Sequence, residues 1–184
     1  MNKSKIAGIA FNVPDNIVTN HDLEKMMDTT DEWIQTRSGI KERRWVKPGV
    51  ANSDLALPAC QEAIQNAGIS PDDIDAIVVG TVTSDFNFPG MAPIIQQKLG
   101  ISAHVPAYDI SAACSAFIYL LEIGDQYIKS GKYKNILLVG SDIMSTIIER
   151  TPEGRATGVL FGDGSGAVVS VSYTHLTLPT SVTV

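Results

Sequence analysis

Short apolar runs alternate with longer amphipathic stretches along most of this chain. Four runs rich in aliphatic residues predict buried strands, at residues 5–11, 76–81, 105–110 and 135–141. Between them, apolar positions recur at helical spacing, and several such stretches end at a glycine. These patterns predict helices at residues 21–27, 31–37, 52–67, 92–99 and 117–129. Strands separated by helix-sized crossovers are typical of a mostly parallel α/β sheet with helices on both faces.

Two stretches fit this alternation less well. Residues 159–171 predict two short strand-like pieces around a glycine-rich turn, and residues 41–48 predict a basic loop. Positive charge is concentrated around that loop. It is carried by Arg37, Lys41, Arg43, Arg44 and Lys47.

Composition narrows the classes of function. The chain has 184 residues, of which 44% are apolar and 18% charged, as in an ordinary globular domain. The net charge of −6 argues against general nucleic-acid binding. No apolar run is long enough to cross a bilayer and the start of the chain does not fit a signal peptide, so we expect a cytoplasmic protein with no membrane partner. The 2 cysteines and 3 histidines lack metal-site spacing, so we expect no metal.

Cys114 lies at the predicted turn between strand 105–110 and helix 117–129, with Ser111 as a candidate N-cap. Unpaired N–H groups and the positive dipole at a helix N-terminus favour the thiolate, which is the nucleophilic form. The apolar run that follows suits a helix buried in a core. Cys114 is therefore a candidate nucleophile. The alternative is that it is a small buried side chain, as we expect for Cys60.

Three segments resemble the thiolase-like condensing enzymes, and specifically β-ketoacyl-acyl-carrier-protein synthase III. They are residues 28–40 with Arg43 beyond them, residues 107–117 and residues 161–167. Their order and spacing are specific, and the resemblance runs from about Lys5 to about Val171. It implies an α/β, thiolase-like fold, with one βαβαβαββ half whose mixed, mostly parallel sheet is covered by helices.

The resemblance also implies a reaction. In this family a cysteine accepts an acyl group from coenzyme A and condenses it with malonyl-acyl-carrier protein, releasing carbon dioxide, to initiate fatty-acid synthesis. Cys114 would be the catalytic nucleophile of such an acyltransferase. Acyl-CoA would be the substrate, acyl-carrier protein a partner, and no cofactor would be bound permanently. The full-length protein would be a homodimer.

Four residues match the site where this family binds coenzyme A. Trp33 would stack on the adenine, with Thr29 hydrogen-bonding nearby. Arg37 matches a residue at the same mouth, and Arg155 matches the residue that covers the adenine from the other side. Taken singly, such a tryptophan is more often a half-buried core aromatic and such an arginine a solvated surface charge.

Other features of the resemblance carry less weight. Phe88, before Pro89, matches a residue that reaches across the dimer into the neighbouring acyl pocket, but it could instead cover the core of its own subunit. The glycine-rich turn at residues 162–166 superficially suggests a phosphate loop, yet no helix follows it. The basic run is either a solvated loop or a surface that meets acyl-carrier protein or coenzyme A phosphates.

The chain departs from the family pattern in two ways. It holds about one of two βαβαβαββ units, and the other unit supplies the histidine and asparagine that activate decarboxylation. No histidine here is assigned to that role, and we expect the chain alone to lack condensation activity. Residues 1–171 are predicted to form the N-terminal half-domain. Residues 172–184 resemble a translated sequencing adapter and are predicted to be a non-native tail; resequencing the source DNA tests this.

Two alternative functions stay open. One is a related thiolase-like synthase that makes a polyketide starter unit, an alkyl quinolone or hydroxymethylglutaryl-CoA. The other is a non-catalytic half-length protein that binds acyl-CoA or a partner subunit.

Overall fold

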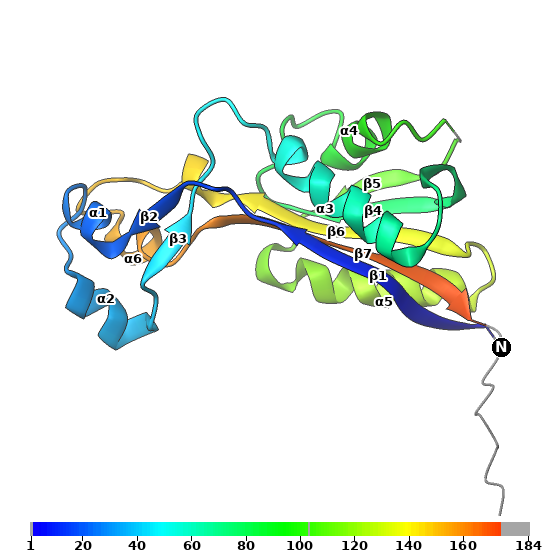
Figure 1. Ribbon diagram of the computed structural model, residues 1–184, viewed down its shortest axis with the longest axis horizontal. Helices are drawn as coiled ribbons and strands as arrows, with labels where there is room; N and C mark the ends of the chain where they lie inside the picture. Colours follow the sequence, from blue (N-terminus) through cyan, green and yellow to red (C-terminus); the bar gives the residue numbers. More distant parts are fainter. Residues whose placement is uncertain (1, 103, 174–184) are drawn as a thin grey trace, which may run out of the picture.

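A five-stranded mixed sheet forms the centre of the molecule, with a smaller lobe at one end (Figure 1). The computed structural model describes residues 2–102 and 104–173. The main sheet contains β1 (Lys3–Asn12), β7 (Asp163–Tyr173), β6 (Asn135–Ile143), β4 (Ala76–Gly80) and β5 (Ala107–Ile110), in that spatial order. Strand β4 is parallel to β5 and β6, whereas β7 is antiparallel to β6 and β1.

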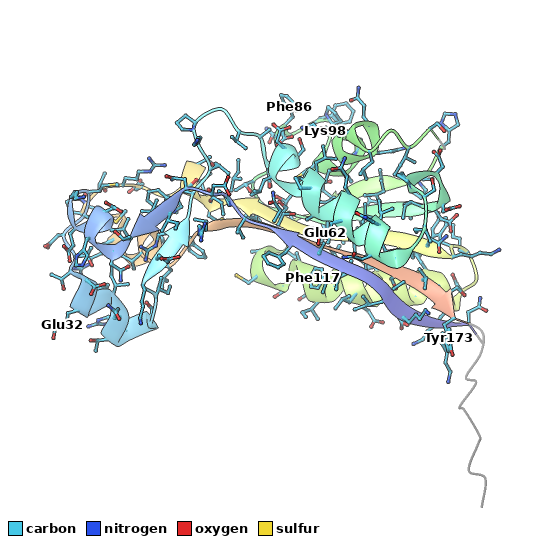
Figure 2. All side chains as sticks on the ribbon, in the orientation of Figure 1. Glu32, Glu62, Phe86, Lys98, Phe117 and Tyr173 are labelled. Carbon is cyan, nitrogen blue, oxygen red and sulfur yellow. The ribbon has the colours of Figure 1, made fainter. Side chains whose placement is uncertain are left out.

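Three helices cover the two faces of this sheet. Helices α3 (Asn52–Ala67) and α4 (Met91–Lys98) lie on one face, and α5 (Ala116–Lys129) lies on the other (Figure 1). Figure 2 shows the same division, with Glu62 on the α3 side of the sheet and Phe117 on the α5 side. All five residues of β4 are buried, as expected for a parallel strand covered on both faces. With the small lobe set aside, the order of elements is βαβαβαββ, and the predicted α/β, thiolase-like class is confirmed.

The small lobe is inserted between β1 and α3 and is completed by a later segment. It contains the antiparallel pair of β2 (Ile17–Thr19) and β3 (Glu42–Arg44), with α1 (Asn20–Glu24), α2 (Asp31–Ser38) and α6 (Arg155–Gly158). Thr30 caps α2, because its hydroxyl accepts a hydrogen bond from Trp33 N, and Gly39 ends α2 in the left-handed conformation. The lobe has its own core, which includes Leu23, Ile34, Trp45 and Val159.

Two local predictions from the sequence are wrong. Residues 41–48 are not wholly a loop, because β3 pairs with β2 there. Residues 159–171 do not form two short strands, because β7 is one strand that pairs along its length with β6 and β1. Gly164 and Gly166 lie within β7, where the partner strands supply the hydrogen bonds that a turn would otherwise need.

Helix α5 is less buried than its apolar sequence predicts. Leu120 and Ile128 are fully buried against the sheet, but Ile118 is 65% and Tyr119 is 52% exposed. On β1, Ile9 and Phe11 are also exposed. The prediction of a helix buried on every side is therefore wrong for the described residues, where only one face of α5 packs on the sheet.

The predicted boundary between residues 171 and 172 falls inside β7. Ser172 and Tyr173 continue this strand opposite Ser4 and Lys3. Residues 174–184, which make up most of the predicted tail, lie outside the described residues.

Close packing between β1 and α3 depends on Gly8. A Cβ atom at Gly8 would lie 2.0 Å from the carbonyl oxygen of Ala63 and 2.6 Å from the nitrogen of Ala67. We predict that Gly8→Ala lowers the free energy of unfolding by about 1–3 kcal/mol, because the helix must move away from the strand. Gly166→Ala is the matched control, since its Cβ would meet its nearest neighbour, the oxygen of Ala10, at 4.0 Å. Urea unfolding measures both, and equal effects would contradict this packing.

Candidate active site

Cys114 lies in a single turn between β5 and α5. The turn is the 3₁₀ helix η2 (Ala113–Ser115), and the Cys114 side chain is exposed. Ala113 has a φ of 45°, in the left-handed region that costs a non-glycine residue about 1–3 kcal/mol. Such strain often marks functional turns. The prediction that Ser111 is the N-cap of this helix is wrong. Helix α5 begins at Ala116, and Ser115 occupies the N-cap position.

The Cys114 thiol opens on a cavity of about 370 Å³ at the ends of the central strands. The walls come from β4, β6, α5 and the segment before β7, and they include Gly80, Phe117, Gly140, Asp142, Phe161 and Gly162. Two of these glycines let α5 approach the sheet. A Cβ atom at Gly80 would lie 2.8 Å from Ala116 Cβ, and one at Gly140 would lie 3.4 Å from Phe117 Cδ2. The absence of side chains at Gly80 and Gly140 therefore lets the start of α5 lie against the ends of β4 and β6.

A partly buried hydrogen-bond network supports the residues that line this cavity. Asp142 Oδ1 accepts hydrogen bonds from Thr81 Oγ1 at 3.0 Å, Val82 N at 2.8 Å and Thr83 Oγ1 at 2.8 Å. Asn52 Nδ2 donates to the Ser141 carbonyl oxygen at 3.0 Å, and Ser141 Oγ donates back to Asn52 Oδ1 at 2.6 Å. This network was not predicted from the sequence. Its only local signal is a run of short polar residues directly after the buried strand β4.

A second cavity, of about 360 Å³, lies in the small lobe between α2 and α6. Its walls include Trp33, Arg37, Arg155, Val159 and Leu160. The guanidinium carbons of Arg155 and Arg37 lie 4.6 Å and 4.8 Å from the centre of the Trp33 ring. Arg155 Nη1 also donates to the Asp28 carbonyl oxygen at 2.8 Å. The structure therefore brings together three of the four residues that the resemblance assigns to coenzyme A.

Arg155 contacts the indole itself in this structure. A flat ring stacked on Trp33 would lie about 4.5 Å or more from the indole centre, which is the distance that the guanidinium occupies. A base can therefore stack on this face only after Arg155 has moved outward.

Thr29 and Phe88 do not line either cavity. The Thr29 hydroxyl is buried without a hydrogen-bond partner among the described residues, close in sequence to the Asp28 carbonyl that Arg155 contacts. Phe88 is 91% exposed in the loop between β4 and α4.

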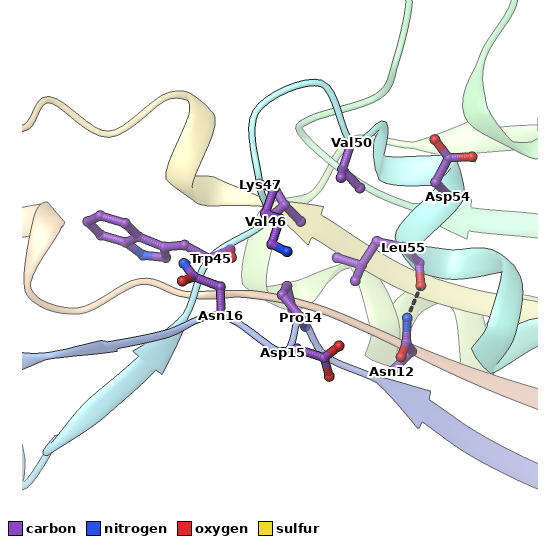
Figure 3. A pocket seen from close by; sticks show the side chains of 10 residues that line it. All are labelled: Asn12, Pro14, Asp15, Asn16, Trp45, Val46, Lys47, Val50, Asp54 and Leu55. Carbon is purple, nitrogen blue, oxygen red and sulfur yellow. Dashed lines mark hydrogen bonds between the residues drawn. The ribbon is translucent and has the colours of Figure 1, made fainter.

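The basic run does not form one surface. Arg37 lies at the Trp33 cavity, Arg43 is buried, and Lys47 lines another cavity of about 240 Å³ beside Trp45 and Leu55 (Figure 3). Asp15 and Asp54 also line that cavity. These three cations therefore lie at three different places.

One segment joins the Cys114 and Trp33 cavities. Residues 155–160 contribute to the wall of the Trp33 cavity, and residues 161–164 contribute to the wall of the Cys114 cavity. We call residues 155–164 the shared wall. A ligand that follows this segment passes from the indole to the thiol.

Residues around β3 hold the shared wall from behind. Arg43 Nη2 donates to the Val159 carbonyl oxygen at 3.1 Å, and Trp45 Nε1 donates to the Phe161 carbonyl oxygen at 3.3 Å. Val46 N donates to Asp163 Oδ2 at 2.6 Å. Residues 43, 45 and 46 therefore bind three alternate residues of the shared wall, and each of these bonds uses a side-chain atom on one side.

Comparison with known proteins agrees with this geometry. Residues 108–175 match the sequence family described as 3-oxoacyl-[acyl-carrier-protein (ACP)] synthase III. The chain is 51% identical over 164 residues to β-ketoacyl-[acyl-carrier-protein] synthase III 1 of Bacillus anthracis, covering 89% of this chain and 52% of that protein. The resemblance to β-ketoacyl-acyl-carrier-protein synthase III is confirmed.

Solved structures of a synthase III and of a priming β-ketosynthase share the fold. The enzyme from Aquifex aeolicus VF5 superposes with a TM-score of 0.89 at 46% identity, over 94% of this chain and 55% of that one. The priming β-ketosynthase of the R1128 polyketide pathway gives a TM-score of 0.87 at 32% identity, over 92% of this chain and 50% of that one. The chain thus spans about half the length of the synthase III relatives that it matches.

Two further features of the described residues bear on the site. None of the helices there is long and apolar enough to span a membrane. Within residues 2–102 and 104–173, histidine, cysteine and acidic side chains form no cluster that would hold a metal ion. The cytoplasmic location stays a prediction.

The two cysteines should differ in reactivity. Cys60 is fully buried in α3, and burial raises the pKa of its thiol to about 12, whereas Cys114 is exposed. We predict that iodoacetamide alkylates only Cys114 in the folded chain near neutral pH, and alkylates both thiols after denaturation. Peptide mass mapping measures the two sites. Equal labelling of Cys60 in the folded chain would contradict the burial described here.

Proposed function

We propose that this chain carries the acyl-accepting half of an initiating condensing enzyme of fatty-acid synthesis. The observation that supports this most directly is the shared wall, which joins an exposed cysteine to a tryptophan–arginine pocket. The names of the relatives support the same reaction class. Acyl-CoA is the proposed substrate, and no bound cofactor or metal takes part.

In the first step Cys114 takes the acyl group. Its thiolate sulfur attacks the thioester carbonyl carbon of acyl-CoA, the carbon–sulfur bond to coenzyme A breaks, and coenzyme A leaves as a thiolate that takes up a proton. The exposed position of Cys114 at the mouth of its cavity suits this attack. Helix α5 begins at Ala116, so the unpaired backbone N–H groups of its first turn lie at the end of the helix that follows Cys114.

Coenzyme A binds with its adenine on Trp33 in this proposal. The adenine takes the place on the indole that Arg155 occupies in the free chain, and Arg155 then covers the outer face of the base. Arg37 lies beside the same indole and is placed to meet phosphate. The buried hydroxyl of Thr29 is available for a hydrogen bond only after local rearrangement.

The second step needs partners that lie outside this chain. Malonyl-acyl-carrier protein loses carbon dioxide, and the resulting carbanion attacks the acyl thioester on Cys114, which frees the sulfur. We propose that a second α/β half supplies the histidine and asparagine for this step. In the complete homodimer, the exposed Phe88 reaches the neighbouring subunit's acyl pocket.

One observation supports the alternative of a synthase that makes a polyketide starter unit. The R1128 protein is named a priming β-ketosynthase and shares the fold at 32% identity. The higher identity of 51% to a β-ketoacyl-acyl-carrier-protein synthase III favours the fatty-acid reaction. The competing proposal of a half-length protein that only binds acyl-CoA differs in one outcome, since it gives no covalent adduct.

Acetylation of Cys114 tests the proposed first step. We predict that acetyl-CoA adds one acetyl group to the chain, that Cys114→Ala abolishes the adduct, and that Cys60→Ala, a matched loss of one thiol, retains it. Intact-mass measurement detects the adduct. An acetyl group that persists in Cys114→Ala, or no adduct in any variant, would overturn the proposal.

Loss of the indole tests the proposed nucleotide site. We predict that Trp33→Ala slows acetylation by acetyl-CoA at least about fivefold, because base stacking on an aromatic ring contributes about 1–3 kcal/mol. The rate is measured at acetyl-CoA concentrations well below saturation. An unchanged rate would show that the adenine binds elsewhere.

A further inference from the structure

Arg43 is a buried cation with an unusual set of partners. Its side chain is 6% exposed, and in the part of the chain that the structure describes no carboxylate forms an ion pair with it. Instead, Nη1 donates to the Val18 carbonyl oxygen at 3.2 Å, and Nη2 donates to the Val159 carbonyl oxygen at 3.1 Å and to Asn20 Oδ1 at 2.8 Å. Burial lowers the pKa of the guanidinium, which an arginine nevertheless keeps protonated.

Asn20 extends this network to both ends of α2. Its side-chain nitrogen donates to Asp31 Oδ1 at 2.8 Å, in the first turn of α2, and to the Ile40 carbonyl oxygen at 2.7 Å, just beyond the last turn. Asn20 is 1% exposed, so these bonds are shielded from water. A single guanidinium is thus linked to α2 through Asn20 and to the shared wall through Val159.

These two links lead to the two walls of the Trp33 cavity. Helix α2 carries Trp33 and Arg37, and the segment that ends at Val159 carries Arg155. The planar guanidinium donates in fixed directions, so it sets the distance between these walls more firmly than a flexible amine would. Burying a cation without a carboxylate partner is costly, and apolar replacements for buried charges are often neutral or stabilising. A gain in net stability therefore does not by itself explain why an arginine occupies this position.

Direct contact with a ligand does not account for it either. Arg43 lies behind Val159 and is absent from the lining of both the Trp33 and the Cys114 cavities. Gly162 of the shared wall packs against it, with a Cβ position only 3.2 Å from Arg43 Cβ. The guanidinium therefore cannot reach coenzyme A phosphates without unpacking the wall.

We propose that Arg43 is a positioning residue that holds α2 and the shared wall at the separation which the nucleotide end of a coenzyme A thioester requires. This inference rests on the proposed function. It predicts a selective defect, because Arg43 sets the nucleotide pocket in the small lobe, whereas Cys114 is held by the main sheet and the network around Asp142.

Two thioesters separate this effect from a general loss of folding. Acetyl-CoA carries the nucleotide, whereas S-acetyl-N-acetylcysteamine presents the same acetyl thioester without it. The apparent second-order rate constant for acetylation of Cys114 in the 184-residue chain is measured with each compound by intact mass. Arg43→Gln is expected to lower the rate with acetyl-CoA about tenfold or more and to leave the rate with the truncated thioester within about twofold.

Two further variants make the test specific. Arg43→Lys keeps the charge but loses the fork of donors, and it is expected to show the same selective loss. Lys41→Gln removes an exposed cation from the same stretch, and both of its rates are expected to match the parent chain.

Each result that would contradict the proposal has a different meaning. If Arg43→Gln slows both thioesters equally, or neither, Arg43 has no positioning role. If Arg43→Lys behaves like the parent, or Lys41→Gln loses as much as Arg43→Gln, charge alone explains the effect and the proposal is wrong. If the parent chain reacts no faster with acetyl-CoA than with the truncated thioester, the nucleotide site itself fails, and this inference fails with it.

Discussion

The hydrogen bonds from residues 43–46 to residues 159–163 hold the two candidate cavities in one structure. The shared wall has no strand partner of its own until β7 begins at Asp163. Its carbonyl groups at Val159 and Phe161 are instead bonded by the side chains of Arg43 and Trp45. Buried carbonyl groups need such partners, so the wall can keep this path only while β3 stays in place.

This arrangement explains why the small lobe belongs to the site. The main sheet alone places Cys114 at the end of β5, where Ala113 adopts its strained conformation, and supports it with the network around Asp142. The lobe adds the indole of Trp33 and the two arginines that lie over it. The main sheet carries the proposed nucleophile, the small lobe carries the proposed surface for a flat heterocycle, and the shared wall connects them.

Much of this fold could be predicted from the sequence, because its signals are local. The buried run of β4 and the capped helix that carries Trp33 are examples, and the motif around Cys114 identified the thiol that lines a cavity. Contacts between residues that are far apart in the sequence could not be predicted. Arg43 looked like part of a basic loop, but its partner Val159 is 116 residues away. Asn52 looked like a helix start, but its partner Ser141 is 89 residues away.

The exposed face of α5 shows a related limit. Its sequence is apolar almost all round, which predicts burial on all sides, yet a sequence does not state which neighbour covers each face. The glycines of β7 gave a similar ambiguity, since a glycine can mark a turn or lie within a strand. In both cases the deciding information is the tertiary neighbour and not the residue itself.

A crystal structure of the chain with bound coenzyme A would show whether the two cavities form one site. We expect the adenine to lie on Trp33 with Arg155 displaced outward, the pantetheine arm to follow residues 155–164, and its sulfur to point toward Cys114. An adenine ordered away from Trp33, or a pantetheine arm that enters the Cys114 cavity from another side, would contradict it.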